Sequence, residues 1–188
     1  MRKPRILLDC DGVLTTSFVD RVCEILRANN HDAHPHHIEQ WDIMKHFKIP
    51  KHAEETIYEK MEQKGVAFDF EPAPGAVEFV RELHTWADVY VVTSPMGGKH
   101  WPHDRQRWLK HWFDIPANHV LNIKHKFVVK GDVLVDDKLS NLTEWHMEFP
   151  QGTPIFWRLP QNRHDKHPYL EASNFDELRK HLHHEGEL

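Results

Sequence analysis

The chain has 188 residues, enough for one sizeable hydrophobic core with a small insertion but hardly for two full domains. Its formal net charge is −5 with a pI near 6.4, so no overall basic field is present and a nucleic-acid polymer is a poor candidate partner. Cys10 and Cys23 are too few for a disulfide framework, and the sequence has no secretory leader or long apolar run, so we expect a cytoplasmic protein without a membrane segment.

The first part of the chain predicts one buried strand followed by a helical insertion. The apolar run 6–8 is bounded by turn residues, as is typical of a buried strand. A helix is expected from Ser17 through residue 28, and Ser17 with Asp20 resembles a capping box. Two further helical stretches, 36–47 and 51–64, lead to Gly65. We therefore interpret residues 17–65 as a helical insertion.

The rest of the chain alternates helical and strand patterns. Apolar spacing predicts helices after Pro74-Gly75 and after Pro102, and a last helix has Asn174 as a candidate N-cap with Glu177 three residues on. Three further apolar runs predict buried strands, at 89–92, 133–135 and 155–157. This alternation predicts an α/β fold with a parallel sheet and right-handed crossovers.

Two surface patterns have more than one interpretation. The 18 histidines include two clusters, His34, His36, His37 and His181, His183, His184. Their spacings fit no closed zinc site, so a solvated, mildly pH-sensitive surface is favoured over a metal site. Residues 99–111 interleave basic and aromatic side chains, but an amphipathic helix is favoured over a nucleic-acid surface because the net charge is negative and no other aromatic platform is present.

Oxygen-bearing side chains follow three of the predicted strands. They are Asp9, Asp11, Thr93, Ser94, Asp136 and Asp137. In an open parallel sheet, ligands bind outside the carboxyl ends of the strands, so these three groups could converge on one pocket. Each group alone would be an ordinary turn or a solvated loop. Their joint order favours a single acidic site.

Such a site has the chemistry of phosphate-ester hydrolysis. Carboxylates in one pocket repel one another unless a cation is present, and hard oxygen ligands favour Mg²⁺. A carboxylate can attack phosphorus once cations and hydrogen-bond donors neutralise the phosphoryl charge. Candidate donors are Thr93, Ser94, Lys126 and the amides around Asp11 and Gly12. Asp11, two residues after Asp9, could protonate the leaving oxygen and then activate water.

The ordered motifs resemble a known superfamily. Asp9-Cys10-Asp11-Gly12-Val13-Leu14, then Thr93, Lys126 and Asp136-Asp137 resemble the four motifs of the haloacid dehalogenase superfamily. Within it, segments 68–76 and 92–95 are similar to the 5′(3′)-deoxyribonucleotidases. The resemblance implies a Rossmann-like core formed by residues 1–16 and 66–188 and a small helical cap at 17–65. It also implies Mg²⁺ and release of phosphate from deoxyribonucleoside monophosphates.

The resemblance also implies a role for each matching residue. Asp9 is the nucleophile and Asp11 the acid/base. The phosphate-binding positions are matched by Thr93, Ser94 and Lys126. The metal ligands are matched by Asp9, the Asp11 carbonyl and the pair Asp136-Asp137, with Asp137 binding directly and Asp136 through water.

Substrate choice is the part that the motifs leave open. After Leu14 the sequence reads Thr15-Thr16-Ser17-Phe18, where the family tends to place a small residue, an acid and an aromatic. Phe18 and Trp41 are candidates to stack on a base, although aromatics at helical spacing are more often core residues. Two alternatives remain: a phosphatase for another small phosphate ester or a polynucleotide 3′ end, and a catalytically weak protein that binds a phosphorylated ligand.

Overall fold

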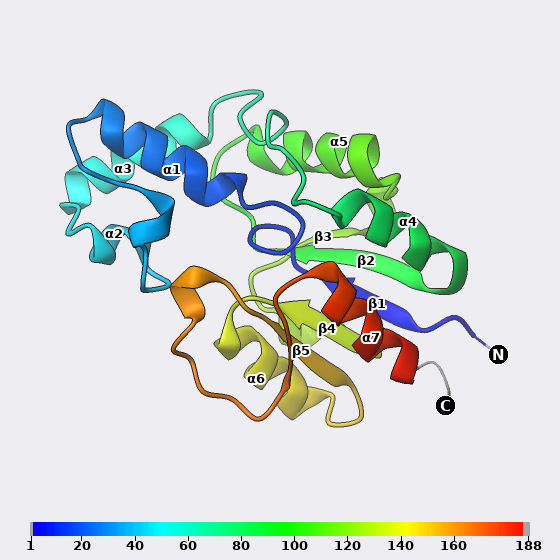
Figure 1. Cartoon of the computed structure of the whole chain (residues 1–188). Helices are drawn as coiled ribbons and strands as arrows, with labels where there is room; N and C mark the ends of the chain where they lie inside the picture. The colour runs from blue at the N-terminus through cyan, green and yellow to red at the C-terminus, as the bar shows by residue number, and fades with distance from the viewer. Residues whose placement is uncertain (1, 186–188) are drawn as a thin grey trace.

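The computed structural model describes the backbone of residues 2–185 and the side chains as far as residue 182. It contains one six-stranded parallel sheet in the order β3-β2-β1-β4-β5-β6 (Figure 1). The strands are β1 (Arg5–Leu8), β2 (Asp88–Thr93), β3 (Val120–Asn122), β4 (Val133–Asp136), β5 (Thr153–Trp157) and β6 (Leu170–Ala172). The predicted α/β fold is confirmed. The strands β3 and β6 were not predicted, because three residues at an edge carry no continuous apolar run.

Successive strand residues face two separate apolar layers. In β1, Ile6 and Leu8 belong to one cluster and Leu7 to the other, as the twofold alternation of a strand requires. Helix α6 (Leu139–Glu148) packs on β4 and β5 in the layer that contains Leu7. The opposite layer contains α4 (Ala76–Trp86), α5 (Trp101–Phe113) and α7 (Phe175–Glu185) (Figure 1). Both faces of the sheet are covered, so its central strands contain unbroken apolar runs.

The insertion is less helical than predicted. It contains α1 (Ser17–Ala28), α2 (Ile43–His46) and α3 (Lys51–Met61), which gather at one side of the molecule (Figure 1). The predicted helical stretch over 36–47 is only partly confirmed: a 3-10 turn at 35–37 and the short α2 are separated by non-helical residues. The Asp42 side chain accepts a hydrogen bond from Lys45 N at 3.0 Å and so starts α2 as a separate helix. Buried residues of α1 and α3 share the apolar cluster of the sheet, and the boundaries of a separate cap stay a prediction.

The two predicted helix caps have different outcomes. The capping box at Ser17 is wrong: Thr16 precedes the helix, and no side chain caps it. The Ser17 hydroxyl instead accepts from Glu71 N at 3.1 Å, which ties the start of α1 to the segment before α4. The cap at Asn174 is confirmed, because its Oδ1 accepts from Glu177 N at 2.9 Å at the start of α7.

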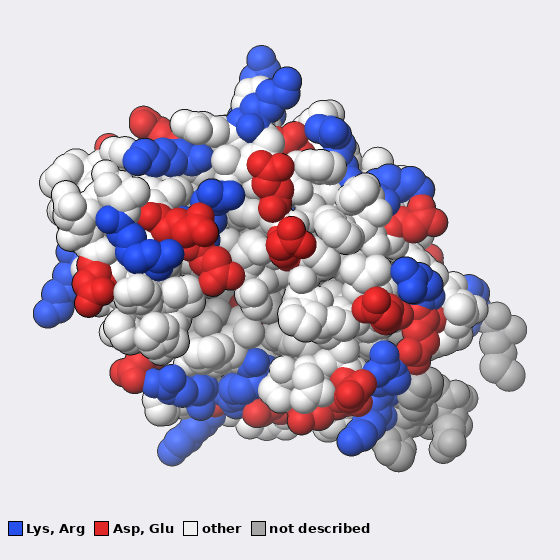
Figure 2. Space-filling view, turned by 45° about the horizontal axis from the view of Figure 1, so that its top comes forward, with Lys and Arg blue, Asp and Glu red and all other residues white. Residues whose placement is uncertain are grey.

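The surface is mixed in charge. Figure 2 shows acidic and basic side chains interspersed over one face, with no continuous field of a single sign. Among the described helices, none combines the length and the apolar character needed to cross a bilayer. The segment 99–111 forms most of α5, whose Trp101 and Trp108 are buried, so it is not an exposed aromatic platform.

Candidate active site

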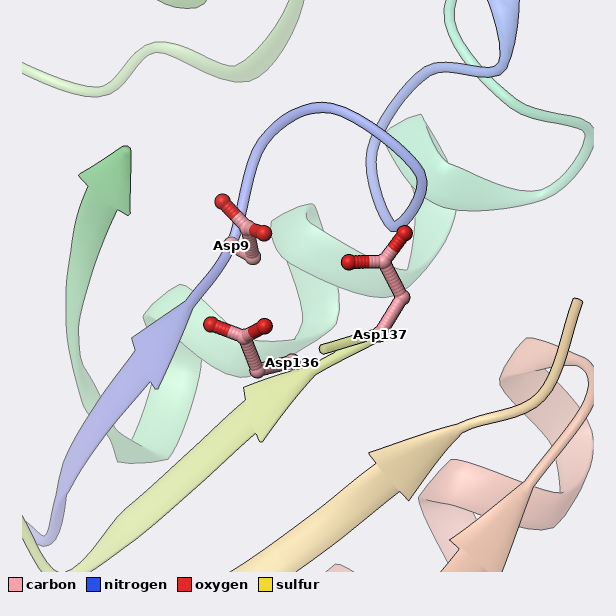
Figure 3. Close-up of side chains that lie close together, drawn as sticks. All are labelled: Asp9, Asp136 and Asp137. Atoms are coloured by element: carbon pink, nitrogen blue, oxygen red, sulfur yellow. The ribbon is translucent and has the colours of Figure 1, made fainter. Parts of the chain in front are cut away.

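The strand register brings the acidic residues to one edge of the sheet. Leu8 pairs with Val91 of β2 and with Val135 of β4, so the residues that follow these strands emerge side by side. The Asp9 backbone N–H donates to the Val135 carbonyl at 2.9 Å, which fixes this alignment. Carboxylate oxygens of Asp9, Asp136 and Asp137 lie within 4.8 Å of one another, and Figure 3 shows the three side chains around one space.

Lys126 is the cation of this cluster. It begins a short 3-10 turn, is buried, and places Nζ 2.8 Å from Asp9 Oδ1 and 2.5 Å from Asp136 Oδ2. Asp9 Oδ1 also accepts from the Cys10 N–H at 2.7 Å, whereas Oδ2 receives no hydrogen bond from the described residues. One oxygen of Asp9 is therefore held and the other remains available for reaction.

The two residues of the second acid pair have different surroundings. Both oxygens of Asp136 are bonded, to Lys126, to the Lys138 N–H at 2.9 Å and to Asn141 Nδ2 at 3.0 and 3.1 Å. Asp137 Oδ1 is buried and has no hydrogen-bond partner among the described residues. A buried carboxylate oxygen without a donor is unfavourable unless a cation binds it. Asp137 thus has the free ligand atom.

Gly12 makes room for this carboxylate. A Cβ at position 12 would lie 2.0 Å from Asp137 Oδ2, and Gly12 has a φ of +95°, so both space and backbone conformation favour glycine. The Gly12 N–H donates to the Thr15 carbonyl at 2.7 Å and is therefore engaged within the loop. Close approach of Asp137, rather than a free amide, is what this glycine provides.

Burial disfavours the ionised forms of the carboxyl groups in this aspartate cluster. Burial raises the pKa of Asp9 to about 7, which Lys126 opposes and Asp136 reinforces. Burial, together with Asp9 and Asp136, also raises the pKa of Asp137 well above its ordinary value. Burial alone would lower the pKa of Lys126, but the carboxylates of Asp136 and Asp9 raise it overall. A bound cation would remove this repulsion, so the donor set fits a hard divalent metal ion such as Mg²⁺.

Asp11 lies outside the three-carboxylate group. Its Oδ1 accepts a hydrogen bond from Arg105 Nη2 at 2.6 Å, and burial raises its pKa while Arg105 opposes that shift. The sequence did not indicate a site role for Arg105. The available signal was the spacing of Trp101, Arg105 and Trp108, which places them on one helix face.

The remaining predicted site residues lie around the cluster. Thr93 ends β2 and is buried, while Ser94 is exposed. Phe18 packs edge-on against Trp101, with ring centroids 6.0 Å apart. Trp41 is 43% exposed, and its ring centre lies 5.9 Å from Lys138 Nζ, next to the acid pair. Trp41 is thus the more accessible of the two candidate stacking residues.

The histidines of the described part of the chain form no comparable site. The rings of His34, His36 and His37 lie together, with centroids 4.2 to 5.4 Å apart. Of the groups that could hold a metal ion within the described residues, however, only the aspartate group has ligand atoms close enough together. His36 and His37 are exposed and His34 is half-buried, which agrees with the interpretation of this cluster as surface residues. The side chains of His183 and His184 lie outside the described residues.

Comparison with known proteins identifies a family over nearly the whole chain. Residues 3–182 match the family described as 5′ nucleotidase, deoxy (pyrimidine), cytosolic type C protein. The human cytosolic-type 5′(3′)-deoxyribonucleotidase is 30% identical over 179 residues, covering 87% of this chain and 84% of that protein. The human mitochondrial 5′(3′)-deoxyribonucleotidase is 32% identical over 146 residues, which cover 73% of this chain but only 63% of that longer relative.

Solved structures share the fold at low sequence identity. A conserved haloacid dehalogenase-like protein from Agrobacterium tumefaciens has a TM-score of 0.68 at 13% identity, covering 98% of this chain and all 100% of that one. A haloacid dehalogenase hydrolase from Bacillus subtilis, bound to magnesium, has a TM-score of 0.56 at 11% identity and covers 97% and 99% of the two chains. The chain therefore has the fold of these haloacid dehalogenase-like proteins, and the family match confirms the predicted resemblance to the 5′(3′)-deoxyribonucleotidases.

Proposed function

The chain belongs to the family of 5′ nucleotidases, deoxy (pyrimidine), cytosolic type C, and we propose that it releases phosphate from deoxyribonucleoside 5′- or 3′-monophosphates. It does so with Mg²⁺ and through a phosphorylated Asp9. The observation that carries this proposal is the meeting of Asp9, Asp136 and Asp137 with Lys126 at the carboxyl ends of β1 and β4. The names of the relatives support the substrate class.

The charge balance supports a divalent cation. The carboxylates of Asp9, Asp136 and Asp137 face one buried cation, Lys126, so three negative charges and one positive charge leave two negative charges. The Asp11 carboxyl group, which carries the proton in the first step, is held separately by Arg105. Asp9, Asp137 and the Asp11 carbonyl would hold Mg²⁺, with Asp136 acting through water because its oxygens are already bonded. When bound, Mg²⁺ neutralises phosphate charge and so lowers the barrier to attack by an anion.

The proposed reaction has two steps, which the residues around Asp9 carry out. Asp9 Oδ2 attacks phosphorus, the bond from phosphorus to the ester oxygen breaks, and Asp11 gives its proton to the departing alcohol. In the second step Asp11 takes a proton from water, the water oxygen attacks phosphorus, and Asp9 is released as inorganic phosphate leaves. Lys126 and the Thr93 hydroxyl neutralise and position the phosphoryl oxygens.

Trp41, exposed at the rim near Lys138, would stack on the base of the nucleotide. The substrate is a small molecule, and the face seen in Figure 2 offers a polynucleotide no continuous basic track. Cys10 and Cys23 are free and buried, which is compatible with the expected reducing, cytoplasmic location.

Phosphate release from a substrate panel tests the proposal. The panel contains deoxyribo- and ribonucleoside 3′- and 5′-monophosphates and an aryl phosphate, each with Mg²⁺ or with EDTA. We expect a deoxyribonucleotide to be preferred, EDTA to stop turnover, and Asp9→Asn to abolish it. Asp88→Asn, at the opposite end of the neighbouring strand, is the matched control and should retain full activity. Turnover of the aryl ester alone would reject the substrate, and no turnover at all would favour a phospho-ligand-binding protein.

A further inference from the structure

Two carboxyl groups of the first loop are held by different buried cations. Lys126 Nζ lies 2.8 Å from Asp9, whereas Arg105 Nη2 lies 2.6 Å from Asp11. Asp11 is not part of the carboxylate group that could hold a metal ion. The two carboxyl groups, two positions apart in the chain, thus have separate environments, as two groups with different tasks in one reaction require.

Arg105 is enclosed by aromatic rings. Its guanidinium carbon lies 4.9, 4.8 and 5.2 Å from the ring centres of Phe70, Trp101 and Trp108. Trp108 Nε1 donates to the Phe70 carbonyl at 2.6 Å, which joins two walls of this enclosure. The faces of such rings attract a cation and exclude water from it. The position of the guanidinium is therefore fixed by packing before any substrate binds.

Asp11 is the hydrogen-bond partner that this guanidinium has within the described residues. The Arg105 side chain is 0% exposed, and its Nε and Nη1 bond to no described group. A desolvated cation is costly unless it is paired, so the bond to Asp11 is strongly maintained. Asp11 nevertheless keeps 25% of its side chain exposed. The carboxyl group is restrained without being closed off from a substrate.

We propose that Arg105 is a positioning residue that holds the Asp11 carboxyl group at the point where the leaving alcohol departs, away from the metal-binding carboxylates. This inference rests on the proposed function, because it takes Asp11 as the proton donor. When the bond from phosphorus to the ester oxygen breaks, the alcohol takes the Asp11 proton. The carboxylate that remains keeps its bond to Arg105 and stays in place to accept a proton from the attacking water.

The test compares two substrates that differ in their need for a proton donor. A deoxyribonucleoside 5′-monophosphate must release an alcohol, whereas 2,4-dinitrophenyl phosphate releases a stable phenolate without a proton. The ratio kcat/KM reports the first step, in which Asp9 is phosphorylated. We expect Arg105→Met to lower kcat/KM about 100-fold or more for the nucleotide but less than about fivefold for the aryl ester, in line with the usual contribution of a general acid.

Arg107→Met is the matched control on the same helix. Arg107 also lies over an aromatic ring, 4.6 Å from the centre of Phe68, but its side chain is 54% exposed and it does not contact Asp11. It should change both rates by less than about twofold. If Arg105→Met does not fold, Arg105→Lys keeps the charge but loses the planar fork, and we expect the same order of losses with smaller size.

The outcomes separate the inference from the proposed function. Equal losses on the two substrates, with a wild type that turns over both, would overturn the positioning role and leave the nucleotidase proposal intact. A wild type that turns over neither substrate would overturn both. A selective loss on the nucleotide supports the inference, because a general structural defect would slow the two reactions alike.

Discussion

Replacing Asp137 by Asn should stabilise the metal-free protein and remove most of the stabilisation that Mg²⁺ provides. Asp137 Oδ1 is buried without a hydrogen-bond partner, and burial raises the pKa of this carboxyl group. A raised pKa means that the charged form destabilises the folded, metal-free protein above the pKa of the unfolded chain. Removing the charge at pH 8 should relieve about 1–3 kcal/mol. At about 2–4 °C per kcal/mol for a chain of this size, the Tm in EDTA should rise by about 2–12 °C.

The same substitution should reduce the stabilisation that Mg²⁺ binding provides. At a concentration of 100 times the Kd, a bound ion stabilises the wild type by about 2.7 kcal/mol, or about 5–11 °C. Loss of a direct carboxylate ligand should weaken binding about 100-fold or more, which leaves less than about 0.5 kcal/mol at the same concentration. In Asp137→Asn the Mg²⁺-induced rise in Tm should therefore nearly vanish.

Differential scanning fluorimetry with EDTA or Mg²⁺ measures both effects. Asp132→Asn is the matched control at the amino end of the same strand, where Arg2 holds the carboxylate at 2.6 Å and lowers its pKa. It should lower the Tm slightly and keep the full Mg²⁺ response. An Asp137→Asn variant with a lower Tm in EDTA and an undiminished response to Mg²⁺ would refute the assignment of Asp137 as a metal ligand.

The other predictions concern neighbouring parts of the site. Lys126→Met removes the cation that pairs with the buried carboxylates, so the free energy of unfolding measured in urea should fall by about 3–5 kcal/mol. The variant should also lose most of its phosphate release, and a stable, active variant would contradict this prediction. Burial raises the pKa of Asp9 from 3.8 to about 7, so the EDTA-treated protein should lose stability as the pH rises through that range. Over the same range the Mg²⁺-induced rise in Tm should grow. A rise in Tm that does not depend on pH would contradict this prediction. Gly12→Ala, whose Cβ would lie 2.0 Å from Asp137 Oδ2, should cost about 1–3 kcal/mol and weaken Mg²⁺ binding in calorimetry. Unchanged stability and Mg²⁺ affinity would contradict the close approach of Asp137 to this glycine. Trp41→Ala should raise KM for a nucleotide about 5-fold or more with almost no change in Tm, and an unchanged KM would exclude stacking.

The central strands could be predicted because of how they are buried. Strands β1, β2, β4 and β5 are covered on both faces, so each contains an unbroken apolar run. The edge strands β3 and β6 are short and mixed, and only pairing with a neighbour defines them. In the insertion, Asp42 looked like one polar residue in a helical pattern, and its capping role depends on a local hydrogen bond.

The candidate site divides in the same way. Asp9 and the pair Asp136-Asp137 could be placed together from the sequence, because parallel strands present their carboxyl ends at one edge. The role of Arg105 could not be predicted from the sequence, because its hydrogen bond to Asp11 spans 94 positions and depends on how α5 packs against the loop after β1. The hydrogen bond of the Gly12 N–H and the different hydrogen bonding of Asp136 and Asp137 likewise depend on tertiary contacts, which the spacing of residues in the sequence does not reveal.

Chemical trapping of the intermediate tests the central claim most directly. The Mg²⁺-loaded protein is mixed with a preferred substrate, treated with borohydride, which reduces an aspartyl-phosphate to an alcohol, and digested for mass spectrometry. The account predicts this reduction at Asp9, dependent on substrate and Mg²⁺ and not found at Asp11. Phosphate release without any reduction at Asp9, or reduction at another carboxyl group, would contradict it.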